Sequence, residues 1–177
     1  MRRVAILGNA GGGKSTLARL LTTRHDLPYH EVDKLVWLPG WRLRPEAEYA
    51  ALHDAIIAGE CWLMDGIGRR EFIAPRLARA SEIILVDMPF EVHRRLVLQR
   101  HAAWQAGTLD HPPGDHADAP PLDAVLAMMK EIDQDWMPEI RRLVAAEEAA
   151  GKSVRRIAGP EELTEMQDAL RRRPDAT

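Results

Sequence analysis

Eight residues near the start of the chain, GNAGGGKS, are of the types that bind phosphate. Gly8, four intervening residues, and then Gly13, Lys14 and Ser15 fit the Walker A spacing G-x-x-x-x-G-K-[ST]. Glycines allow backbone turns that direct several N–H groups at one anion. A glycine-rich turn that binds nothing is the alternative, and it leaves the lysine and the serine unexplained. The residues predicted to bind ATP are Gly8, Asn9, Ala10, Gly11, Gly12, Gly13, Lys14, Ser15 and Thr16.

Two of these residues are predicted to act on the phosphates and on a magnesium ion. The Lys14 ammonium group supplies charge for the β- and γ-phosphates, and the Ser15 hydroxyl is a magnesium ligand. Further along the chain, the apolar run CWLMD ends in Asp65, and the ends of parallel strands share one edge of a sheet. We therefore predict that Asp65 holds Mg²⁺ together with Ser15. A helix-capping aspartate is the alternative.

Arg69 follows Asp65 after three intervening residues, just beyond the predicted strand end. A guanidinium group can bind a phosphate or a carboxylate through two parallel hydrogen bonds. We therefore predict that Arg69 binds an anionic acceptor, and an ordinary solvated arginine is the alternative.

The hydrophobic pattern predicts a sheet that would bring these residues together. Short β-rich apolar runs alternate with longer amphipathic stretches, which is typical of βαβ units around a parallel sheet. The predicted strands are 3–7, 28–32, 61–65, 82–87 and 153–157. The predicted helices are 14–24, 45–59, 71–78, 91–104, 122–150 and 160–172, with a break at Pro138 in the longest. The predicted fold class is α/β, a five-stranded parallel sheet flanked by helices.

Composition limits the class of protein. The 177 residues suit a single domain over 1–177, and 46% apolar with 29% charged residues is typical of globular proteins. A net charge of -3 gives no overall attraction to nucleic acid or to anionic membranes. No run of eighteen apolar residues and no signal-peptide pattern is present, which predicts a cytoplasmic protein. Cys61 is the one cysteine, so an intrachain disulfide is impossible, and we predict a buried strand thiol.

One segment, GTLDHPPGDHADAPP at 107–121, has no apolar periodicity. Loops of more than about a dozen residues in compact domains are usually active-site lids or disordered segments. The arginine-bearing helix before it favours a small lid over a disordered loop. His111 and His116 with nearby aspartates suggest a metal site, but spacing alone favours a solvated polar loop. The end of the chain, 171–177, is predicted to be a frayed tail.

Three stretches together carry a resemblance to a known family. GNAGGGKST, LMDGIGRR and VDMPFEVHRRLVLQRH resemble the adenylate kinase-like group of P-loop phosphotransferases. More narrowly, HEVDKLVWLPGW with the Asp-Gly strand end is similar to bacterial proteins often labelled "DNA topology modulation protein", which are themselves adenylate kinase-like. The resemblance covers about 3–101 well and the remainder loosely. It implies an acceptor-binding segment at about 33–60 and an arginine-bearing lid at about 101–135.

The resemblance also implies roles for single residues. Arg69 matches the arginine that binds the acceptor phosphate in adenylate kinases, and Arg100 matches a lid-base arginine that embraces the transferring phosphoryl group. Asp33 matches an aspartate that meets the acceptor hydroxyl in small-molecule kinases of the superfamily. With Lys14, these three are the predicted catalytic residues.

Two interpretations are open for each of several other side chains. Trp37 and Trp41 either stack on a ring of the acceptor or belong to the core. Four further arginines either add to a phosphate clamp or carry ordinary surface charge. They are Arg94, Arg95, Arg141 and Arg142.

The function predicted from these residues is phosphoryl transfer from ATP to a small acceptor, namely a nucleoside, a nucleotide or a hydroxylated metabolite. Ile67 and Gly68 stand where true adenylate kinases have a phenylalanine-proline pair, which argues against AMP as acceptor. One alternative is an ATP-binding, nucleic-acid-associated regulator, which the negative charge disfavours. Another is an ATPase without an acceptor. The sequence predicts no nucleic-acid or membrane partner and leaves the acceptor and the oligomeric state open.

Overall fold

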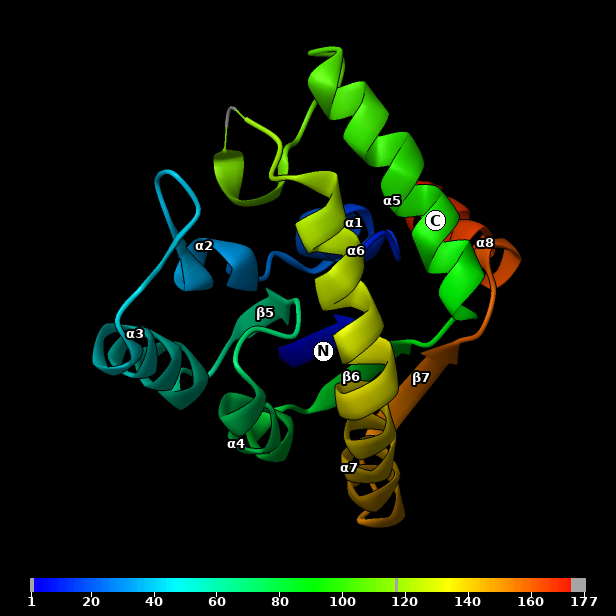
Figure 1. Cartoon of the computed structure of the whole chain (residues 1–177). Helices are drawn as coiled ribbons and strands as arrows, with labels where there is room; N and C mark the ends of the chain where they lie inside the picture. Colours follow the sequence, from blue (N-terminus) through cyan, green and yellow to red (C-terminus); the bar gives the residue numbers. More distant parts are fainter. Residues whose placement is uncertain (1, 117, 173–177) are drawn as a thin grey trace.

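Five parallel strands form the central sheet in a computed structural model that describes residues 2–116 and 118–172. The strand order is β2-β5-β1-β6-β7 (Figure 1). The strands are β1 (Arg3–Gly8), β2 (Tyr29–Glu31), β5 (Trp62–Asp65), β6 (Glu82–Val86) and β7 (Ser153–Ile157). All five predicted strands are confirmed, to within one or two residues at each end. Residues 173–177 of the predicted tail lie outside the described residues.

Helices cover both faces of this sheet. On one face α1 (Lys14–His25) packs against α8 (Pro160–Arg171). The helices on the other face are α3 (Glu46–Ala58), α4 (Ile73–Arg79) and α7 (Met137–Ala149). Two more, α5 (Phe90–Gln105) and α6 (Leu122–Glu131), flank the segment 107–121 of the predicted lid (Figure 1). A five-stranded parallel sheet flanked by helices confirms the predicted fold class.

The apolar strands make this arrangement possible because successive side chains enter opposite cores. In β1, Val4 and Ile6 pack with α1 and α8, whereas Ala5 and Leu7 pack with the helices of the other face. All four are fully buried. An unbroken apolar run of this kind is typical of a parallel strand covered on both sides.

The predicted helix over 122–150 is interrupted by a π-helical turn, Ile132–Trp136, that lies ahead of Pro138. Helix α7 resumes at Met137 and has this proline in its first turn. The missing N–H of a proline costs nothing there, because the first-turn amides of a helix have no intrahelical acceptor. Pro138 therefore lies in the first turn of α7 and does not break the helix there.

The segment after β2 contains structure that the sequence pattern did not predict. A short helix, α2 (Val32–Val36), leads into a two-stranded antiparallel hairpin of β3 (Trp37–Leu38) and β4 (Arg42–Leu43). The prediction for Cys61 is wrong. This residue is exposed, because β5 begins one residue later and Cys61 belongs to the turn before it.

None of the helices in the described ranges combines the length and the apolar character needed to cross a bilayer.

Gly8→Ala is expected to lower the free energy of unfolding by about 3 kcal/mol. Gly8 has a φ of +141°, and a Cβ there would lie 2.2 Å from the Val86 carbonyl oxygen on the paired strand. Gly159→Ala is the matched control, because no atom lies within 4 Å of its Cβ position. Its unfolding free energy should stay within about 1 kcal/mol of the original. Urea denaturation measures both, and equal stabilities of the two variants would contradict the expectation.

Candidate phosphate-transfer site

The loop between β1 and α1 has the backbone of a phosphate cradle. Gly8, Gly11 and Gly13 all have positive φ, a conformation that favours glycine. Gly13 also precedes α1, and no described side chain caps that end of the helix. The first-turn amides of α1 are therefore available to an anion, in the direction that the helix dipole favours.

Close packing explains why glycine is found at 11 and 13 of this loop. A Cβ on Gly11 would lie 2.8 Å from both the His93 carbonyl oxygen and a methyl group of Val97 in α5. A Cβ on Gly13 would lie 2.7 Å from Leu163 in α8. The loop therefore packs closely against α5 and α8, and glycine at these positions lets its backbone keep that place.

Lys14 is the first cation of the site. Its Nζ donates a hydrogen bond to the Asn9 carbonyl oxygen at 2.8 Å. Burial lowers the pKa of Lys14, whereas the charges of Asp65 and Asp33 raise it and the charge of Arg100 lowers it. The structure thus brings together the ammonium group, both predicted carboxylates and the predicted lid arginine.

Asp65 and Ser15, the two predicted magnesium residues, lie beside each other. The Asp65 carboxylate, 2% exposed at the end of β5, accepts a hydrogen bond from the Tyr29 hydroxyl at 3.0 Å, and the nearby Ser15 hydroxyl favours its charged form. Burial raises the pKa of Asp65, and the hydroxyl donors and Lys14 oppose that shift. Oxygen ligands of this kind suit Mg²⁺. The sequence analysis missed Tyr29, which nothing marks except its place on the strand next to β5.

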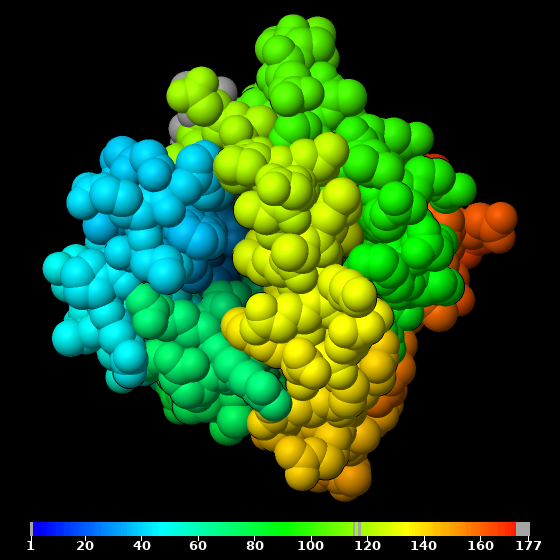
Figure 2. All heavy atoms as spheres, viewed as in Figure 1, coloured from blue at the N-terminus to red at the C-terminus, as the bar shows by residue number. Residues whose placement is uncertain are grey.

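A cavity of about 400 Å³ opens in front of the phosphate loop. No residue of α2 or α6 lines this cavity, whereas the hollow that Figure 2 shows lies between the light-blue part of the chain and the yellow α6. One wall of the cavity comes from the phosphate loop and another from the predicted lid. The lining includes Gly11, Gly12, Gly13, Lys14, Ser15, Thr16, Arg19, Glu31, Leu96, Arg100, Thr108, Leu109, Asp110, His111 and Pro113.

Arg100 is the second cation in this cavity. It lies on α5, and burial lowers the pKa of its guanidinium while the negative charges of Asp33 and Glu31 raise it. Among the described side chains and backbone groups, none forms a hydrogen bond or a close ion pair with it. A half-buried cation without a close partner has unused capacity for an anion.

Asp33 lies in the first turn of α2, partly buried, and acts electrostatically on Lys14, Asp65 and Arg100. Glu31, two residues earlier, was missed by the sequence analysis although it lines the cavity. It is 7% exposed, burial raises its pKa, and it accepts a hydrogen bond from the Gly114 amide at 2.9 Å.

Arg69 is not among the residues that line the cavity. Its guanidinium donates to the Arg44 carbonyl oxygen and lies over the Tyr49 ring, 5.5 Å from the ring centre. Its Nε is buried without a hydrogen-bond partner among the described residues. Arg69 therefore faces the start of α3, within the predicted acceptor-binding segment.

Two sets of contacts connect the predicted lid with β2 and with the acceptor-binding segment that follows it. One is the bond between the Gly114 amide and Glu31. The other is Trp41, which stacks on His116 at 4.0 Å between ring centres and donates from its indole nitrogen to the Asp118 carbonyl oxygen at 3.0 Å. Trp37 and Trp104 contact Trp41 edge-on. The tryptophans therefore join the β3–β4 hairpin to the lid.

The four arginines with open roles do not line the cavity. Arg141 makes two hydrogen bonds of 2.8 Å each to the Asp87 carboxylate, and Arg94 pairs with Glu91 on its own helix. Arg95 and Arg142 are exposed. A clamp formed by these residues remains a prediction.

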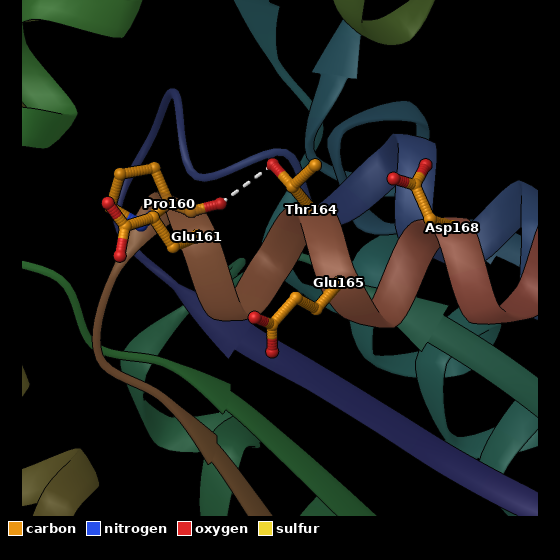
Figure 3. Close-up of a pocket in the computed structure, with 5 residues that line it drawn as sticks. All are labelled: Pro160, Glu161, Thr164, Glu165 and Asp168. Carbon is orange, nitrogen blue, oxygen red and sulfur yellow. Dashed lines mark hydrogen bonds between the residues drawn. The ribbon is translucent and has the colours of Figure 1, made fainter.

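A second hollow lies along α8, on the side shown in Figure 3. Glu161, Glu165 and Asp168 project into it from successive turns, and Thr164 donates to the Pro160 carbonyl oxygen. Three carboxylates at one surface repel phosphate. This hollow therefore does not suit a phosphate-bearing ligand.

Comparison with known proteins supports a P-loop fold. No protein-family model matches the chain. Over 114 residues it is 32% identical to the aliphatic sulfonates import ATP-binding protein SsuB of Granulibacter bethesdensis, a match that covers 49% of this chain and 48% of that protein. The chain thus spans about half the length of the curated relative that it matches.

Solved structures with the same fold are P-loop kinases. Shikimate kinase from Aquifex aeolicus has a TM-score of 0.51 at 17% identity, with 96% of both chains covered. A gluconokinase from Sinorhizobium meliloti has a TM-score of 0.54 at 15% identity, with 96% of this chain and 91% of that chain covered. Shikimate kinase from Acinetobacter baumannii, in complex with shikimate, has a TM-score of 0.53 at 15% identity, with 97% and 92% covered. At these identities the likeness establishes the fold.

Proposed function

We propose that this protein is an ATP-dependent phosphotransferase that acts on a small hydroxylated acceptor. The observation that carries the proposal is one cavity that holds both halves of such a site. The Walker loop with Lys14 and Arg100, which has no close partner among the described groups, both line this cavity. Asp33 is not among the lining residues, and its charge acts on both cations. The fold shared with shikimate kinase and gluconokinase supports the same reaction class.

Each of these residues has a separate proposed role. The loop amides and Lys14 neutralise the β- and γ-phosphates, and Arg100 stabilises the charge that develops on the transferring group. Asp33 orients the acceptor hydroxyl or takes its proton. Ser15 and Asp65 would hold Mg²⁺, which, when bound, bridges the phosphates and neutralises their charge.

The acceptor itself is proposed to carry an anionic group. Arg69 faces the start of α3 in the acceptor-binding segment, where its guanidinium lies 4.0 Å from the Glu46 carboxylate. This group therefore already attracts an anion, and a phosphate or a carboxylate of the acceptor is its proposed partner. The class remains that of nucleosides, nucleotides and hydroxylated metabolites, with anionic members expected to react best. The cytoplasmic location, the likeness to adenylate kinases and the narrower likeness to proteins labelled "DNA topology modulation protein" stay predictions. The kinase-like neighbours do not favour a nucleic-acid-associated regulator.

An acceptor screen tests the proposal. Release of ADP from magnesium-ATP is measured with nucleosides, nucleoside monophosphates, and hydroxylated acids and phosphates added one at a time. The proposal expects at least one compound to accelerate release and to gain a phosphoryl group, as detected by mass spectrometry. Slow hydrolysis that none of them accelerates would instead indicate an ATPase without an acceptor.

Asp33→Asn is expected to lower kcat about 10²-fold with the best acceptor of that screen, because the amide cannot take the hydroxyl proton. The dissociation constant for magnesium-ATP, measured by calorimetry, should change less than about threefold. Asp54→Asn is the control, because Asp54 is an exposed aspartate on α3. An unchanged kcat in Asp33→Asn would remove Asp33 from the reaction.

A further inference from the structure

Both backbone polar atoms of Ala10, in the phosphate loop, form hydrogen bonds with side chains. Its amide donates to the Asn9 side-chain oxygen at 2.8 Å, and its carbonyl oxygen lies 2.9 Å from Nδ1 of His93. The Asn9 amide nitrogen in turn donates to the Met129 carbonyl oxygen at 2.8 Å, across 120 residues of sequence. Neither Asn9 nor Ala10 lines the cavity, although both were predicted to bind the nucleotide.

His93 contacts the loop at more than one place. It is 1% exposed in the first turns of α5. Its ring carbon Cε1 lies 2.9 Å from where a Cβ on Gly12 would be, and its carbonyl oxygen lies 2.8 Å from that position on Gly11. The ring therefore lies directly behind the turn that forms the cradle.

The chemistry of the contact fixes the proton on Nδ1. A carbonyl oxygen only accepts hydrogen bonds, so Nδ1 must carry the hydrogen and donate it. Burial lowers the pKa of His93, and the nearby ammonium of Lys14 lowers it further, against opposing effects of the Ala10 bond, Asp133 and Asp87. The ring is therefore neutral at neutral pH, and it adds no charge next to Lys14.

We propose that His93 is a positioning residue of the phosphate loop: its Nδ1–H holds the Ala10 carbonyl oxygen against α5, so that the amides from Gly11 onward face the nucleotide phosphates. A carbonyl oxygen free to turn into the cradle would place negative charge where phosphate binds, and would remove a buried hydrogen bond. The inference rests on ATP binding at the proposed site and not on the identity of the acceptor.

Three replacements of His93 test whether a hydrogen-bond donor at the position of Nδ1 is required. His93→Leu keeps an apolar body without a donor, and His93→Gln places a donor at the Nε2 end of the ring. His93→Asn places its amide nitrogen at the same bond count as Nδ1. The dissociation constant for magnesium-ATP, measured by calorimetry, should rise about tenfold in the leucine and glutamine variants, which corresponds to about 1.4 kcal/mol. In His93→Asn it should stay within about threefold of the original.

A second readout does not depend on bound nucleotide. Hydrogen exchange of the loop amides at 9–13 should be faster in His93→Leu than in the unmodified protein, and close to the original rate in His93→Asn. His53→Leu is the control, because His53 is another fully buried histidine, located on α3. Its thermal unfolding reports the general cost of replacing a core histidine, while its ATP affinity should be unchanged.

The outcomes separate this inference from the proposed function. Absence of magnesium-ATP binding by the unmodified protein would overturn the proposed function itself. Normal binding by the unmodified protein together with equal affinity in folded His93→Leu would overturn only the role of His93. Equal losses of affinity in His93→Asn and His93→Leu would also overturn it, because the Nδ1 donor would then not be the cause.

Discussion

Replacing Arg100 with alanine is expected to lower kcat at least about 10³-fold, while the dissociation constant for magnesium-ATP rises less than about tenfold. An arginine that stabilises the transferring phosphoryl group contributes about 10³–10⁵ in rate in comparable phosphoryl-transfer enzymes. That range corresponds to about 4–7 kcal/mol of barrier. Arg100 suits this role because it lines the cavity and has no close partner among the described groups. Steady-state kinetics gives kcat, and calorimetry gives the affinity.

The split between rate and affinity is what identifies the role of Arg100. Its neighbours Asp33 and Glu31 already attract the guanidinium before any nucleotide binds, so part of its ground-state interaction is satisfied by the protein. Negative charge that develops on the phosphoryl group only during transfer would interact with the part of the guanidinium that these carboxylates do not neutralise. Arg155→Ala is the control, because Arg155 is an exposed arginine on β7. Near-normal kcat in Arg100→Ala would remove the assignment of the lid-base arginine.

The sequence predicted the parts of the site that depend on local pattern. The Walker spacing located Lys14 and Ser15, and an apolar run ending in an aspartate located Asp65. The rule that parallel strands end at one edge then placed these residues together, and in the structure the Ser15 hydroxyl is close enough to Asp65 to favour its charged form. Strand positions followed from the same patterns, because burial on both faces leaves an unbroken apolar run.

The parts that the sequence did not predict depend on contacts between distant segments. The bond between Glu31 and Gly114 spans 83 residues, and so does that between His93 and Ala10. Glu31 and His93 belong to common residue types, and no spacing rule pairs them with a partner so far along the chain. Trp41 is similar, since its two interpretations could be separated only by the three-dimensional position of His116. The prediction for Cys61 failed at an element boundary, where sequence patterns are least reliable.

Lys14→Ala is expected to damage both binding and turnover, and so to differ from Arg100→Ala. Asp65 and Asp33 both act electrostatically on the Lys14 ammonium, so its loss leaves two carboxylates uncompensated at the position that the phosphates must enter. Losing the cation that neutralises the phosphates is expected to weaken magnesium-ATP binding about 10²-fold, which corresponds to about 3 kcal/mol. Loss of a preorganised cation lowers kcat by about a further 10²–10³-fold. Lys130→Ala, at an exposed lysine on α6, is the control in the same calorimetric and kinetic assays. ATP affinity within threefold of the original in Lys14→Ala would show that the glycine-rich cradle does not bind the phosphates.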